Sequence, residues 1–205
     1  MRMYLGIDID SVKGFLDPEE GARLYTAALE ASQLGPVLEI GSYCGKSTVY
    51  LGAACKEIGA VLYALDHHRG SEEHQPGEDY HDPALFDAEA GRMDSFREFR
   101  LTVQRAGLDD LIVPLVAPSE LVSRHWHTPL GMVFIDGGHS MAAAEMDYRC
   151  WAPQVMRGGL LAIHDIFPDP KDGGWPPYEI YKLALASGLF EDLGMTKTLG
   201  MLRRL

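Results

Sequence analysis

The chain has 205 residues, 46% of them hydrophobic, which is enough for one ordinary α/β core. Its 18 lysines and arginines against 30 aspartates and glutamates give a net charge of −12, the wrong sign for a protein that follows a nucleic-acid backbone. Three cysteines lack metal-ligand spacing, and no apolar run approaches the roughly 18 residues of a membrane span, so we expect a cytoplasmic protein with no membrane and no nucleic-acid partner.

The predicted elements begin with a helix, because Asp17 is a favourable N-cap and Pro18 suits the first helical position. Short apolar runs follow, separated by segments of helix length, at residues 37–40, 61–65, 112–116, 132–135 and 160–163. Continuous apolar runs indicate strands that are covered on both faces. The sequence therefore predicts a doubly wound α/β fold with a mostly parallel sheet, in a single domain spanning residues 1–205.

Two further segments shape the prediction. Residues 69–93 are polar and form a connector longer than the roughly 15 residues usual in compact domains, so we expect an inserted loop that is either a lid or disordered. Apolar residues at helical spacing predict a core-packing helix over 93–106.

A glycine turn directly follows the first predicted strand, where residues 37–47 read Val-Leu-Glu-Ile-Gly-Ser-Tyr-Cys-Gly-Lys-Ser. Such a turn brings backbone N–H groups close to a polar ligand. The spacing of Gly41 and Gly45 differs from that of dinucleotide sites, and Ile40 stands where a phosphate loop needs its first glycine. A phosphate-loop nucleotide hydrolase that uses Lys46 and Ser47 is nevertheless kept as an alternative.

Polar residues follow each predicted strand and should meet at the carboxyl edge of the sheet. Asp66 comes after the second strand, where an acidic side chain can accept both ribose hydroxyls of an adenosine. The alternative is that Asp66 only caps the segment that follows. Its neighbour His67 is expected at the mouth of the site, and Ser119 lies at the end of the third strand.

The ends of the fourth and fifth strands carry the residues expected to act in catalysis. Asp136 and Asp165 would converge there, and two like charges in a dry site require a cation or a raised pKa. A divalent metal bound by Asp136, His164 and Asp165 is one solution, with the alternative that His164 is only a fixed hydrogen-bonding partner. His139 is the predicted general base, acting beside Asp136, because imidazole accepts a proton near neutral pH; its alternative role is to cover a helix end.

The Glu-x-Gly-x-x-x-Gly spacing, together with Asp66 and the Asp-Gly-Gly-His of residues 136–139, resembles class I S-adenosylmethionine-dependent methyltransferases. The similarity is to small-molecule O-methyltransferases and cephalosporin-hydroxylase-like members, and it runs from about residue 12 to the end. It implies a Rossmann-like seven-stranded sheet with an antiparallel edge strand, closed by a hairpin in residues 194–205. A non-catalytic cofactor-binding protein of the same fold stays open as an alternative.

The resemblance also implies what the protein binds. S-adenosylmethionine would be the cofactor, magnesium or manganese the metal, a small molecule with a hydroxyl group the acceptor, and a second copy of the chain a partner in a homodimer. The residues expected to hold the cofactor are Glu39, Gly41, Ser42, Tyr43, Gly45, Ser47, Asp66, His67, Ser119 and Asp136. Glu39 would either orient the glycine turn or accept a hydrogen bond from the cofactor's ammonium group.

Overall fold

The computed structural model describes residues 3–71, 74–78, 80–169, 171 and 173–205. Its helices are α1 (Pro18–Ala31), α2 (Lys46–Ile58), α3 (Phe96–Arg105), α4 (Ser119–Ser123), α5 (Met141–Trp151) and α6 (Trp175–Ala186). The strands of the main sheet are β1 (Val37–Ile40), β2 (Leu62–Leu65), β5 (Ile112–Leu115), β6 (Leu130–Ile135), β7 (Val155–Ile163), β8 (Phe190–Thr196) and β9 (Leu199–Arg204). A two-stranded ribbon pairs β3 (Phe86–Asp87) with β4 (Arg92–Met93).

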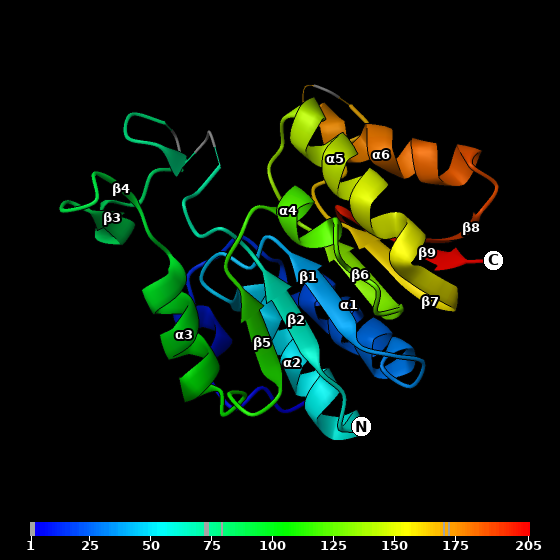
Figure 1. Ribbon diagram of the computed structural model, residues 1–205, viewed down its shortest axis with the longest axis horizontal. Helices are drawn as coiled ribbons and strands as arrows, with labels where there is room; N and C mark the ends of the chain where they lie inside the picture. The colour runs from blue at the N-terminus through cyan, green and yellow to red at the C-terminus, as the bar shows by residue number, and fades with distance from the viewer. Residues whose placement is uncertain (1–2, 72–73, 79, 170, 172) are drawn as a thin grey trace.

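The seven strands have the order β5-β2-β1-β6-β7-β9-β8 (Figure 1). The first five are mutually parallel, whereas β9 runs antiparallel to both of its neighbours, one position in from the edge. This confirms the predicted seven-stranded, mostly parallel sheet. Because β1 lies between β2 and β6, the residues that follow these three strands emerge side by side.

Helices cover both faces of the sheet, as the uniformly apolar strands predicted. One buried cluster joins the sheet to α1, α2 and α3, and a second joins its other face to α5 and α6. Every residue of β1 and of β6 is buried. Along β1 and β6, therefore, no polar side chain is accessible, and accessible polar residues begin only where these strands end.

The helix starts follow from local sequence. Asp17 caps α1 by accepting a hydrogen bond from the Glu19 backbone N–H at 2.8 Å, and Glu20 completes a capping box. The predicted start of the third helix at residue 93 is wrong by three positions, because Met93 pairs with Phe86 in the β3–β4 ribbon. The closing hairpin likewise begins at residue 190 rather than 194.

Part of the 69–93 segment can be described, while residues 72–73 and 79 lie outside the described residues. The described part contacts the segment before α1: Lys13 forms an ion pair with Asp82, and the ring of Phe15 packs edge-on against Tyr80 with centroids 5.3 Å apart. The connector therefore lies against the N-terminal segment beside the carboxyl edge of the sheet. Among the described residues, no helix has the length and apolar character needed to cross a membrane.

Candidate active site

A cavity of about 430 Å³ opens at the carboxyl edge of the sheet. Eleven of the predicted site residues line it, namely Gly41, Ser42, Tyr43, Ser47, Asp66, His67, Ser119, Asp136, His139, His164 and Asp165. Glu39 and Gly45 do not line the cavity. Most of the predicted site residues therefore lie in one continuous cavity.

The glycine turn forms the floor of the cavity. Gly41 has a φ of +88°, and a Cβ atom there would lie 2.0 Å from the carbonyl oxygen of Asp136, so only glycine allows β1 and β6 to approach this closely. Ser42 is 1% exposed, and its hydroxyl has no hydrogen-bond partner among the described residues. An unpartnered polar atom of this kind in a cavity wall indicates a place for a polar ligand.

Glu39 lies beneath the turn rather than in the cavity. Its carboxylate accepts hydrogen bonds from the hydroxyls of Ser47 at 2.5 Å and Thr48 at 2.6 Å, both in the first turn of α2. Burial raises the pKa of Glu39 to about 8, against the opposing effect of these two hydroxyls. The geometry therefore favours Glu39 as the residue that orients the turn, and its direct contact with the cofactor stays a prediction. Thr48 was not predicted, although Ser-Thr at a helix start beside a buried glutamate was a usable signal.

Asp66 joins the turn to the end of β2. Its Oδ2 accepts a hydrogen bond from the Tyr43 backbone N–H at 2.8 Å, and its Oδ1 accepts one from the His68 N–H at 2.7 Å. Each carboxylate oxygen can accept more than one hydrogen bond, so these contacts fix the side chain and leave capacity for ligand hydroxyls. The neighbouring ring of His67 is half exposed, with Nδ1 3.9 Å from Asp66.

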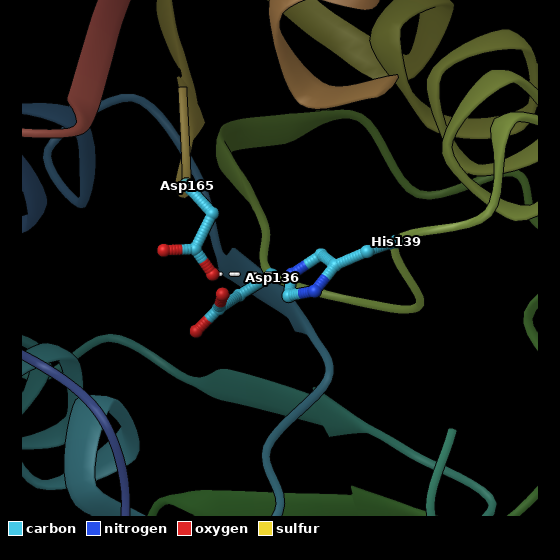
Figure 2. Close-up of side chains that lie close together, drawn as sticks. All are labelled: Asp136, His139 and Asp165. Atoms are coloured by element: carbon cyan, nitrogen blue, oxygen red, sulfur yellow. Dashed lines mark ion pairs between the residues drawn. The ribbon is translucent and has the colours of Figure 1, made fainter. Parts of the chain in front are cut away.

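Three side chains from the ends of β6 and β7 converge on the other side of the cavity. Figure 2 shows Asp136, His139 and Asp165 pointing toward one another, and His139 Nε2 lies 3.1 Å from Asp165 Oδ2. One potential ligand atom from each lies within 4.8 Å of the others. Asp165 has a φ of +54°, a strained backbone conformation that turns the chain back toward this group.

His164 is held behind this group by two carboxylates. Its Nδ1–H donates to Asp136 Oδ1 at 3.0 Å, and its Nε2–H donates to Glu20 Oε2 of α1, also at 3.0 Å. Burial alone would lower the pKa of His164, but Asp136 and Glu20 raise it to about 11. The protonated ring has no lone pair to offer, which favours the alternative that His164 is a fixed hydrogen-bonding partner. The residues whose potential ligand atoms lie together are Asp136, His139 and Asp165, and a metal role for His164 stays a prediction.

Glu20 is a functional candidate that the sequence did not identify. It is 3% exposed, and its Oε1 accepts hydrogen bonds from the backbone N–H and the hydroxyl of Thr198, both at 2.8 Å. These contacts and His164 lower the pKa of Glu20 to about 2, although burial opposes the shift. Because 144 residues separate Glu20 from His164, no local pattern could have predicted their contact.

The phosphate-loop alternative is not supported by this geometry. Lys46 donates from Nζ to the Gly14 carbonyl oxygen at 3.4 Å, and α2 begins directly after a Gly-x-x-x-Gly turn rather than after a phosphate-binding loop. The sheet order, the glycine turn and the polar strand ends together define a Rossmann-like α/β protein with its site at the carboxyl edge.

Comparison with known proteins gives the family. The model of the Methyltransferase domain family matches residues 38–166, more than half of the chain, and the chain belongs to that family. This confirms the resemblance and removes the nucleotide hydrolase as an explanation of the fold.

Solved structures with the same fold include several O-methyltransferases. The O-methyltransferase NovP is 14% identical with a TM-score of 0.70, over 91% of this chain and 79% of its own. An O-methyltransferase from Bacillus cereus, in complex with S-adenosylhomocysteine, is 16% identical with a TM-score of 0.61, over 93% and 83% of the two chains. TomG from Streptomyces achromogenes, an O-methyltransferase of tomaymycin synthesis in complex with S-adenosylmethionine, is 14% identical with a TM-score of 0.62, over 93% and 81%. At these identities the likeness is one of fold.

Proposed function

We propose that this protein transfers the methyl group of S-adenosylmethionine to a hydroxyl oxygen of a small molecule. The observation that carries the proposal is the single cavity that runs from the glycine turn and Asp66 to the group of Asp136, His139 and Asp165. It joins a surface suited to a nucleoside to a cluster suited to proton transfer. Family membership and the O-methyltransferases of the same fold support this assignment.

The residues present fit the cofactor. Asp66 is positioned to accept hydrogen bonds from the two ribose hydroxyls, since its carboxylate is already fixed by Tyr43 and His68. The unpartnered Ser42 hydroxyl and the close backbone approach at Gly41 suit the amino-acid portion. Bound in this way, the cofactor supplies a methyl group on a positively charged sulfur.

The chain's own contribution to the reaction is alignment and proton removal. The acceptor oxygen forms a bond to the methyl carbon, the bond from that carbon to sulfur breaks, and sulfur keeps the electron pair. His139 takes the hydroxyl proton, and Asp165, 3.1 Å from its Nε2, orients the ring and stabilises its protonated form. Asp136 is held in place by His164 and faces the same space.

The group of Asp136, His139 and Asp165 also fits a divalent cation. Two carboxylates and one imidazole favour Mn²⁺, Fe²⁺ or Zn²⁺ over Mg²⁺, which prefers an all-oxygen environment. Such an ion would acidify the acceptor hydroxyl. His139 would then be a metal ligand rather than the general base. The acceptor hydroxyl would lose its proton because the positive charge of the ion lowers the pKa of that hydroxyl.

The experiment that tests the function is methyl transfer from radiolabelled S-adenosylmethionine to a panel of catechols, phenols and sugars, in the presence and absence of chelator. Oxygen methylation of at least one acceptor, reduced in His139→Ala, is the expected result. Cofactor binding without transfer to any member would favour the non-catalytic alternative. The single-domain boundary at 1–205, the lid role of 69–93, the homodimer and the cytoplasmic location stay predictions.

A further inference from the structure

A buried carboxylate in the cavity wall has no role in the proposed reaction. Asp147 on α5 is 4% exposed and lines the cavity. Its Oδ1 has no hydrogen-bond partner among the described residues, although buried carboxylate oxygens are nearly always paired. The position therefore calls for a hydrogen-bond donor that the chain itself does not provide.

Asp147 lies on the side of the cavity where β5 ends. Its helix α5 packs against α4, which begins at Ser119 after β5. Burial raises the pKa of Asp147 to about 6, and the Ser119 hydroxyl opposes that shift. In the sheet β5 is the neighbour of β2, the strand that Asp66 follows. A base that extends from a ribose at Asp66 toward the β5 end would therefore come to the side of the cavity that carries Asp147.

The backbone beside Asp147 is shaped around its side chain. A Cβ atom on Gly137 would lie 2.7 Å from Asp147 Oδ2, so any residue larger than glycine would push against the carboxylate. The Ser119 hydroxyl already accepts a hydrogen bond from Trp151 Nε1 at 2.7 Å, which fixes the neighbouring wall. The glycine at 137 thus leaves room for the carboxylate at the cavity wall, beside a Ser119 whose position is fixed by Trp151.

We propose that Asp147 is a specificity-determining residue that accepts a hydrogen bond from the exocyclic amino group of the cofactor's adenine. This inference rests on the proposed function, because it needs an adenosine bound with its ribose at Asp66. An amino group donates to a carboxylate, whereas the carbonyl oxygen of hypoxanthine at the same position cannot. The site should therefore discriminate between the two bases.

The test compares the binding of S-adenosylhomocysteine and S-inosylhomocysteine by calorimetry. The wild-type protein should bind the adenosyl compound roughly 10- to 100-fold more tightly, because the inosyl compound leaves the buried carboxylate unpaired. In Asp147→Asn the amide can turn its NH₂ group toward the hypoxanthine carbonyl, so the preference should fall to about 1 or invert. Glu145→Gln, an exposed change on the same helix, should keep the wild-type ratio.

Each outcome decides the question. Equal binding of the two compounds by the wild-type protein would overturn the inference without any variant. Equal weakening of both compounds in Asp147→Asn would show that Asp147 only supports the Gly137 turn, and would overturn it as well. A wild-type protein with no affinity for either compound would instead mean that the proposed function itself fails.

Discussion

Replacing Glu20 by glutamine tests the buried arrangement that holds Asp136 in place. The glutamine carbonyl can keep both hydrogen bonds from Thr198. The change removes the charged contact of Oε2 with His164 and the longer hydrogen bond, 3.3 Å, that Oε2 accepts from the Asp17 backbone N–H. Removing one partner of a buried ion pair costs about 3–5 kcal/mol, and a charge-assisted hydrogen bond about 1.5–3 kcal/mol. We expect Glu20→Gln to lower the free energy of unfolding by about 3 kcal/mol at pH 7.

The pH dependence of the free energy of unfolding tests the same contact between Glu20 and His164 in a second way. The pKa of His164 is raised from 6.5 to about 11, so the stability it contributes is fully present below pH 6.5 and is lost as the pH rises toward 11. Titration of His164 alone should lower the free energy of unfolding of the wild-type protein by about 1.4 kcal/mol for each pH unit in that range. The slope should be smaller in Glu20→Gln, where His164 has lost one of the three carboxylates near its ring and keeps Asp136 at 3.0 Å and Asp165 at 3.5 Å from Nδ1.

Urea unfolding at pH 7 and pH 9 measures both quantities, provided that the m-value is unchanged. Glu19→Gln is the matched control, because Glu19 is the exposed neighbour on the same helical turn and should change stability by less than about 0.5 kcal/mol. If Glu20→Gln is as stable as this control at pH 7 and shows the wild-type slope, the account of His164 as a protonated bridge is refuted.

Three other predictions concern the cavity. Asp66→Ala should weaken S-adenosylhomocysteine binding at least about 10-fold in calorimetry, since both ribose hydroxyls lose their acceptor, and unchanged binding would remove Asp66 from the cofactor site. His139→Ala should lower kcat by about 10²–10⁴ without changing cofactor affinity, and turnover within a fewfold of the wild type would exclude it as the base. Mn²⁺ should bind more tightly than Mg²⁺ in titrations without cofactor, and Asp165→Asn should weaken that binding; a variant with wild-type affinity would rule out the site formed by Asp136, His139 and Asp165.

The fold could be predicted because its signals are local. Apolar runs of four or five residues, the cap at Asp17 and the glycines at 41 and 45 each specify a short piece of structure. For the same reason most of the site residues predicted at the strand ends lie in the cavity wall. The seven-stranded sheet and its antiparallel strand were implied by the family resemblance rather than by these local signals.

The contacts that decide each residue's role were beyond local reasoning. The sequence left His164 open between a metal ligand and a fixed hydrogen-bonding partner, and only the contact of its second nitrogen with Glu20 of the first helix favours the latter. Glu39 was expected in the cavity, but hydroxyls at the start of α2 cover both of its oxygens. Asp147 gave no signal, since an acidic residue within a helix usually faces solvent. In each case the side chain's partner comes from an element that only tertiary packing brings near.

Calorimetric titration of the purified protein with S-adenosylhomocysteine tests the central claim most directly. The account predicts saturable binding of one molecule per chain, because a single cavity joins the turn at Gly41 to the carboxylate of Asp66. Absence of binding at millimolar ligand, in protein shown to be folded, would contradict it.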